Sequence, residues 1–180
     1  TNSKFVGVDV QTQQPDCQTT QESGVGMSLP AYSLLYFCDD KYDLTLHDVR
    51  VENVQYDGAV GDYYVNLIYF GNGISVRISR GSFTSNSVRN GDVLDFNGVT
   101  ASVTDSVFVG NNGSDGTAIW AADTDMSIVN STFISNSAYL DANTATSGVV
   151  RLERSNISIT NIRMQDNVIN GDGTLALVNA

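Results

Sequence analysis

The tetrapeptide Phe108-Val-Gly-Asn111 decides the fold, because copies of it stand at equal distances before it and after it. The copies are Phe83-Thr-Ser-Asn86 and Phe133-Ile-Ser-Asn136, and Met164-Gln-Asp-Asn167 follows after a somewhat longer interval. The extra residues of that interval are expected in the polar stretch 140–146, and a degenerate first copy is expected at Val54-Gln-Tyr-Asp57. The chain is therefore predicted to repeat one structural unit five times.

Each unit also carries apolar residues at fixed distances from its anchor. Five positions before the anchors stand Val49, Ile78, Val103, Ile128 and Ile159. Two positions further back, at sites that alternate with polar residues, are His47, Val76, Ala101, Met126 and Ile157, so His47 is expected to face inward. A second apolar run follows each anchor: Leu67–Phe70, Val93–Leu94, Ala118–Trp120, Val149–Val150 and Leu175–Leu177.

The composition favours short strands and turns. Asn, Ser and Thr number 17, 19 and 15 among 180 residues, beside 16 Gly and 2 Pro. Units of about 25 residues suit a solenoid, whereas propeller blades need about 40 or more. We therefore predict an all-β protein: a right-handed parallel β-helix (β-solenoid) of about five coils over residues 44–180, preceded by irregular strands or coils over 1–43.

Stacked coils place equivalent residues above one another, about 4.8 Å apart. The anchors are then expected to form two internal columns: Phe83, Phe108, Phe133 and Met164 in one, and Asn86, Asn111, Asn136 and Asn167 in the other. An amide ladder of this kind bonds along the stack and satisfies backbone groups of the turns, so its predicted role is structural.

The anchors are followed by glycine and small aliphatic residues, as in Asp115-Gly-Thr-Ala-Ile119 and Ser147-Gly-Val-Val150. Over about 44–180 the pattern resembles the passenger repeats of polymorphic outer-membrane proteins, within the pectin-lyase-like group of right-handed parallel β-helices. The resemblance implies a surface or secreted protein used in adhesion or as a fibre. The same fold group also hosts polysaccharide lyases and hydrolases.

Charge and motifs limit the partners. With 9 Lys and Arg against 20 Asp and Glu, the net charge of −11 argues against nucleic acid and anionic membranes. No apolar run approaches the roughly 18 residues of a membrane span.

Asp39, Asp40 and Asp43 lack the spacing of a calcium loop, and an ion pair expected between Arg80 and Asp105 is interpreted as a cross-strand pair. We expect no catalytic, metal or cofactor site; a polysaccharide lyase or hydrolase is the enzymatic alternative.

Cys17 and Cys38 are the whole cysteine complement and stand nearly one coil length apart. They predict a disulfide in an oxidising compartment, and two free buried thiols in a cytosolic protein are the alternative. N-glycosylation sequons begin at Asn112, Asn130 and Asn156, about as many as this composition gives by chance. Their turn-like positions are expected to leave room for glycans.

These features predict an extracellular or cell-surface structural module of a fibre, filament, stalk or adhesin, which self-associates through its ends or faces. A carbohydrate-binding or polysaccharide-degrading β-helix protein is the alternative. Exposed aromatic residues would favour that alternative, but Tyr63, Tyr64, Tyr69 and Trp120 are expected in the core or an interface. The apolar run near residue 180 leads us to expect that further coils follow or that another copy docks there.

Overall fold

The computed structural model describes residues 4–6, 32–38, 43–56, 65–71, 73–88, 91–114, 116–139, 148–170 and 178–179. Their only regular secondary structure is strand, and almost all strand pairs are parallel, which confirms the prediction of an all-β protein built from parallel sheets. Within these ranges, no helix is present that could cross a membrane.

In the part of the chain that the structure describes, five successive repeats of four strands follow two leading strands, β1 (Lys4–Val6) and β2 (Tyr32–Cys38). The first repeat comprises β3 (Asp43–His47), β4 (Arg50–Glu52), β5 (Gln55–Tyr56) and β6 (Val65–Gly71). The second comprises β7 (Ser75–Ser79), β8 (Ser82–Thr84), β9 (Ser87–Val88) and β10 (Leu94–Asn97). The third comprises β11 (Thr100–Thr104), β12 (Val107–Val109), β13 (Asn112–Gly113) and β14 (Gly116–Ala122). The fourth comprises β15 (Asp125–Val129), β16 (Thr132–Ile134), β17 (Ser137–Tyr139) and β18 (Gly148–Glu153). The fifth comprises β19 (Asn156–Thr160), β20 (Arg163–Gln165), β21 (Val168–Asn170) and β22 (Val178–Asn179).

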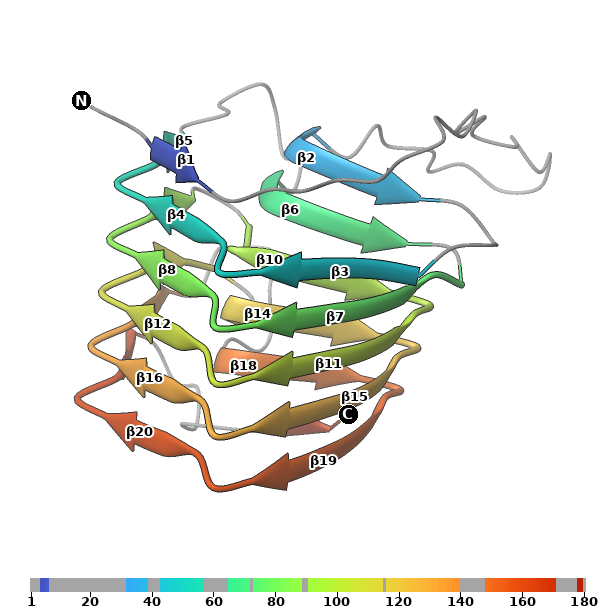
Figure 1. Ribbon diagram of the computed structural model, residues 1–180. Coiled ribbons are helices and arrows are strands. Elements are labelled where there is room, and N and C mark those ends of the chain that lie inside the picture. Colours follow the sequence, from blue (N-terminus) through green and yellow to red (C-terminus); the bar gives the residue numbers. More distant parts are fainter. Residues whose placement is uncertain are drawn as a thin grey trace, which may run out of the picture.

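Each repeat contributes one strand to each of four sheets, so that successive repeats stack (Figure 1). Sheet A has the order β1-β4-β8-β12-β16-β20, and sheet B the order β2-β6-β10-β14-β18-β22. Sheet C has the order β3-β7-β11-β15-β19, and sheet D the order β5-β9-β13-β17-β21. The chain thus passes through sheets C, A, D and B in turn before it starts the next repeat, an arrangement consistent with a parallel β-helix.

The repeats are in register at the anchors, with Phe83 beside Phe108 and Phe133 beside Met164. The first repeat differs from the sequence prediction. Val51 pairs with Phe83, so the first anchor lies at Val51 and the prediction of Val54 is wrong by three residues. The inward position expected of His47 is also wrong, because His47 pairs with Ser79 and is exposed.

Two stacks of aromatic rings run through the core. The ring centroids of Phe83 and Phe108 lie 4.8 Å apart, and Phe133 continues this stack at the same spacing. A second stack, which the sequence analysis did not predict, joins Phe37, Phe70 and Phe96 at 5.5 and 4.9 Å. Each stacked pair adds about 0.5–1.5 kcal/mol to the stabilisation from burial.

The anchor asparagines form a continuous ladder beside the first stack. Oδ1 of Asn111 accepts hydrogen bonds from the backbone N–H and the side-chain amide of Asn86 (3.1 and 3.0 Å). The amide of Asn111 donates to the carbonyl of Phe83 and to Oδ1 of Asn136 (both 2.9 Å). Asn167 continues the ladder with the same contacts to Asn136. The ladder therefore joins neighbouring repeats through buried amides.

Most of the difference in length between repeats lies on one side, and the first corner between sheets B and C, from Gly71 to Ser75, is one residue longer than the next, from Asn97 to Thr100. The turns between sheets C and A and between sheets A and D stay constant, whereas the segment between sheets D and B varies. Between Gly113 and Gly116 it is short, and between Tyr139 and Gly148 it is long. The longer interval before Met164 therefore arises on this side, as the polar stretch 140–146 predicted.

Sheet A ends differently at its two edges. β1 pairs with β4 antiparallel, with Phe5 beside Val51, and so closes the leading edge. β20 forms the other edge, and no further strand pairs with it within the described ranges.

Candidate functional site

Exposed polar side chains form columns at corners where the backbone turns with positive φ. The corners between sheets C and A have φ of 50 to 53° and form one column: Asp48, Arg80, Asp105, Asn130 and Asn161. The corners between sheet B and the next strand of sheet C form a second column: Gly73, Gly98, Asp123 and Arg154. Because equivalent corners share this conformation and stack on one another, their side chains project from one line of the surface.

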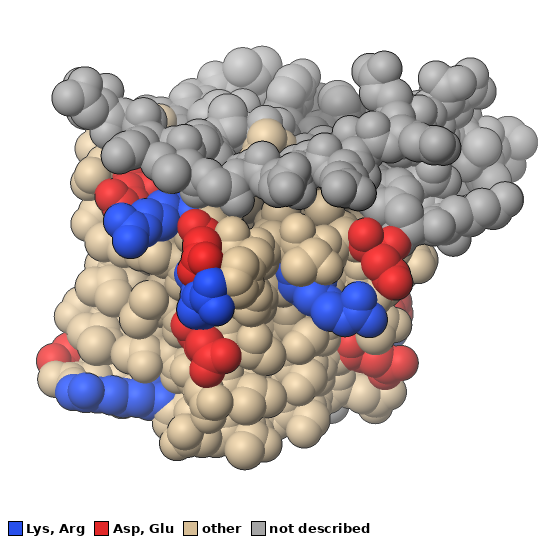
Figure 2. Space-filling view, viewed as in Figure 1, with Lys and Arg blue, Asp and Glu red and all other residues tan. Residues whose placement is uncertain are grey.

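An ion pair joins the first two corners of the C–A column. Nε and Nη2 of Arg80 donate to the two carboxylate oxygens of Asp48, at 2.6 and 2.5 Å. These hydrogen bonds from Arg80 are the main cause of a lowered pKa of Asp48. The pairing expected between Arg80 and Asp105 is corrected: Asp48 binds the guanidinium, and Asp105 only adds to the field that raises the pKa of Arg80. Figure 2 shows acidic and basic groups next to one another in small clusters on this face, with uncharged surface between the clusters.

The same corner brings a serine, a histidine and an aspartate together. Nδ1 of His47 lies 2.6 Å from Oγ of Ser79, and Nε2 lies 3.3 Å from Asp48. However, Nε2 of His47 also contacts Nη2 of Arg80, a group that can only donate. The Arg80 contact suits the tautomer in which Nε2 accepts and Nδ1–H donates to Ser79, whereas the Asp48 contact suits the tautomer in which Nε2 carries the proton. The geometry of this exposed cluster therefore assigns no chemical role to Ser79.

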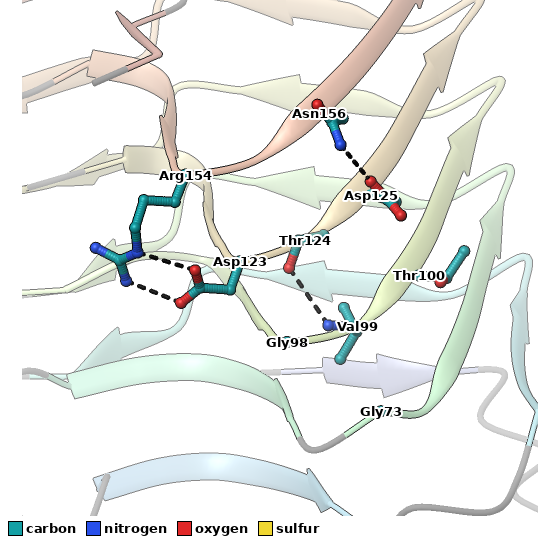
Figure 3. A pocket seen from close by; sticks show the side chains of 9 residues that line it. All are labelled: Gly73, Gly98, Val99, Thr100, Asp123, Thr124, Asp125, Arg154 and Asn156. Carbon is teal, nitrogen blue, oxygen red and sulfur yellow. Dashed lines mark hydrogen bonds and ion pairs between the residues drawn. The ribbon is translucent and has the colours of Figure 1, made fainter.

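A groove lies over the glycine corners of the B–C column (Figure 3). Gly73 and Gly98 place no side chain there, and a Cβ built at Gly98 would meet only open space. Asp123 and Arg154 continue the same column and also line the groove. The cavity volume is about 400 Å³.

The Asp123–Arg154 pair fixes the charged end of the groove. Nε and Nη2 of Arg154 donate to the two carboxylate oxygens of Asp123, at 2.9 and 2.8 Å, and Nη1 contacts Glu153. The hydrogen bonds from Arg154 lower the pKa of Asp123, and the same contacts raise the pKa of Arg154. Both groups therefore stay ionised at neutral pH.

Replacement of Arg154 tests this electrostatic coupling. In Arg154→Gln, the pKa of Asp123 is expected to rise toward its ordinary value, as measured by carboxyl NMR titration. Because the folded state lowers this pKa, the pair stabilises the fold above the unfolded pKa, and its contribution is lost as pH falls through the folded value. Arg163→Gln, in sheet A, is the matched control and should leave the Asp123 titration unchanged. An unchanged titration in Arg154→Gln would contradict the assignment.

The lining of the groove is polar. Thr100 supplies a hydroxyl, and the amide of Asn156 donates to Oδ1 of Asp125 at 2.8 Å. Such groups can hydrogen-bond to a small polyhydroxylated ligand, but the groove offers no aromatic ring among its described lining residues. Gly73 and Gly98 are separated by the same interval as the anchors Phe83 and Phe108. This shared interval is the signal in the sequence from which the groove could have been predicted.

Sheet B carries a mixed column that the sequence analysis missed. Tyr69, Asp95, Trp120 and Arg151 are paired in register, on the face opposite the Phe70–Phe96 stack. Asp95 is buried and accepts a hydrogen bond from the amide of Asn66. Tyr69 and Trp120 are half-buried, so they do not belong to the hydrophobic core. Tyr63 and Tyr64 lie outside the described residues.

The remaining sequence-predicted residues are distributed over the surface. Asn112, Asn130 and Asn156 are all exposed and come from three different sheets or corners. Cys17 lies outside the described residues, so its disulfide with Cys38 stays a prediction. Asp39 and Asp40 also lie outside them, and Asp43 pairs with Arg77 at 3.8 Å. No cluster of metal-ligating side chains occurs within the part of the chain that the structure describes.

Comparison of the chain with protein-family models, curated proteins and solved structures finds no match.

Proposed function

We propose that the chain is a right-handed parallel β-helix that serves as an extracellular structural module of a fibre, stalk or adhesin. It associates with a second copy through the end formed by β19, β20 and β21. The observation that carries this proposal is the exposure of inward-facing residues in the last repeat.

The contrast with the preceding repeat supports this role. Met126, Ile128 and Phe133 are buried, whereas their register partners Ile157, Ile159 and Met164 are only half-buried. Apolar side chains at the end of a stack, beside strand edges with unpaired backbone groups, favour pairing with another chain. The opposite edge of sheet A differs, because β1 already pairs there antiparallel.

The test is association of a variant with a charge at this end. Met164→Lys places an ammonium group at the end of the Phe stack, and the charge should oppose docking. We expect the native chain to associate as its concentration rises in analytical ultracentrifugation, and the variant to stay a monomer.

Gln165→Lys is the matched control, since it adds the same charge at an exposed position of the same strand. It should associate like the native chain. Thermal unfolding of both variants separates lost docking from lost folding. A native chain that stays monomeric at every concentration would contradict the proposal, as would equal association of a folded Met164→Lys variant.

The proposed family rests on features of the sequence. The anchors, with Phe and Asn three residues apart, support a relationship to the passenger repeats of polymorphic outer-membrane proteins, within the pectin-lyase-like group. Cys17 and Cys38 support an oxidising, extracellular location. The mass difference between the native and the reduced, alkylated chain tests the disulfide.

Carbohydrate binding is a second candidate, favoured by the groove over Gly73 and Gly98. Its hydroxyl, carboxylate and amide groups are the types that hydrogen-bond sugars, but it lacks the aromatic platform that strengthens such sites. Titration with plant and bacterial oligosaccharides, followed through the amide resonances of Thr100 and Asn156, tests this function. Resonances that do not shift would exclude it.

A further inference from the structure

We propose that Asn112 carries an N-linked glycan and that the other two sequons, at Asn130 and Asn156, do not. The inference rests on the proposed extracellular location and adds a modification site to it. It follows from the hydrogen bonds of the three asparagines and from one buried hydroxyl.

The amides of Asn130 and Asn156 already bind neighbouring repeats. Nδ2 of Asn130 donates to Asp105 at 3.2 Å, and its Oδ1 accepts from Asn161 at 2.8 Å. Nδ2 of Asn156 donates to Asp125 at 2.8 Å. A sugar on either nitrogen replaces one of its two hydrogens and crowds the carboxylate that the amide contacts in the neighbouring repeat.

Asn112 is different, because its side chain is exposed and makes no hydrogen bond to the described residues. Only its backbone is engaged, with its N–H donating to the carbonyl of Asn86 at 2.8 Å. Its register neighbours in sheet D are Ser87 and Ser137, which are both small. A sugar at Asn112 can therefore extend into solvent without displacing a contact between repeats.

The third residue of this sequon, Ser114, gives independent support. Its Oγ is fully buried and has no hydrogen-bond partner within the described ranges. A buried hydroxyl without a partner destabilises a fold, so alanine would suit this position better. The hydroxyl is required, however, for recognition of Asn112-Gly-Ser114 as a glycosylation acceptor.

The modification is a group transfer from a lipid diphosphate-linked oligosaccharide. The bond between Nδ2 of Asn112 and the anomeric carbon forms as the bond from that carbon to the diphosphate oxygen breaks. The diphosphate leaves on the lipid, and Nδ2 loses one proton. Because Ser114 is buried in the folded chain, the transfer takes place before this repeat folds. The contacts of Asn130 and Asn156 act afterwards, since a sugar at either site hinders the stacking of the repeats and keeps that chain from being secreted.

Three hydroxyl variants test the proposal while keeping every asparagine. Ser114→Ala, Thr132→Ala and Ser158→Ala each remove one sequon, and each is produced with a secretion signal in eukaryotic cells. Intact mass is measured before and after peptide N-glycosidase treatment in ¹⁸O-water, which marks each occupied asparagine by its conversion to aspartate. Both secreted and cell-retained protein are analysed.

We expect the native chain to carry one glycan, at Asn112. Ser114→Ala should lose it and unfold at an equal or higher temperature than the enzymatically deglycosylated native chain, whereas Thr132→Ala and Ser158→Ala should keep it. A native chain without a glycan would overturn the proposal. Occupancy of Asn130 or Asn156 in the secreted protein would also overturn it. Ultracentrifugation of the same samples reports association separately, so either proposal can fail alone.

Discussion

Phe108→Ala is expected to lower the free energy of unfolding by about 3–5 kcal/mol, measured by guanidinium denaturation. Phe108 is fully buried and lies at 4.8 Å from the rings of both Phe83 and Phe133. Its removal leaves a cavity that separates the rings on either side, and the backbone cannot close this gap because the repeats are hydrogen-bonded at a fixed spacing. Both stacked contacts are therefore lost together.

Val107→Ala is the control on the same strand. Val107 is 38% exposed, so its truncation should change the free energy of unfolding by no more than about 0.5 kcal/mol. If Phe108→Ala cost as little as this control, the stack could not be a main source of stability.

Asn111→Ala should destabilise the fold by at least about 2 kcal/mol, although it removes only a small polar side chain. The change takes the Asn111 partner from two buried backbone groups, the N–H of Asn86 and the carbonyl of Phe83. The side-chain amide of Asn86 loses one hydrogen bond and keeps the one to the carbonyl of Val51. Each of the two backbone groups costs about 1–3 kcal/mol when it stays buried and unpaired. Urea denaturation of the native and variant chains measures the difference.

The neighbouring residue provides the comparison for this prediction. Asn112→Ala, in unglycosylated protein, changes the same residue type at an exposed position without side-chain hydrogen bonds to the described residues. Its effect should stay within about 0.5 kcal/mol. Equal effects of the two substitutions would show that the ladder contributes nothing beyond an ordinary asparagine.

The all-β class and the stacking of repeats could be predicted because residues with specific structural requirements recur at a constant interval. Phe108 needs a large apolar space, and Asn111 needs several hydrogen-bond partners when it is buried. The recurrence of this pair at equal intervals therefore implied that equivalent positions meet. The antiparallel pairing of β1 could not be predicted, since alternation around Phe5 indicates a strand but not its direction.

The first repeat was misaligned because its anchor has neither the phenylalanine nor the asparagine of the later anchors. Valine stands at both candidate positions, Val51 and Val54, so the sequence allows two alignments that differ by three residues. The wrong one turned His47 inward and hid the relation between Asp48 and Arg80, which stand 32 residues apart and form the ion pair.

The groove was missed for a different physical reason. It exists because Gly73 and Gly98 place nothing at corners where Asp123 and Arg154 place side chains. A sequence motif is recognised by the side chains that are present. This cavity, by contrast, depends on side chains that glycine lacks at corners whose alignment must first be known. Once the register is known, the glycine positions predict the groove.

The variable segment between sheets D and B makes this molecule a natural scaffold for display. Its length changes from repeat to repeat, while the turns from sheet C to sheet A and from sheet A to sheet D stay constant and the internal columns keep their register. A longer loop adds little closure entropy, about 0.6 kcal/mol for each doubling of length. Foreign peptides inserted into this segment in successive repeats, such as between Gly113 and Gly116 and between Tyr139 and Gly148, would thus be presented in a row along one side at the spacing of the repeats.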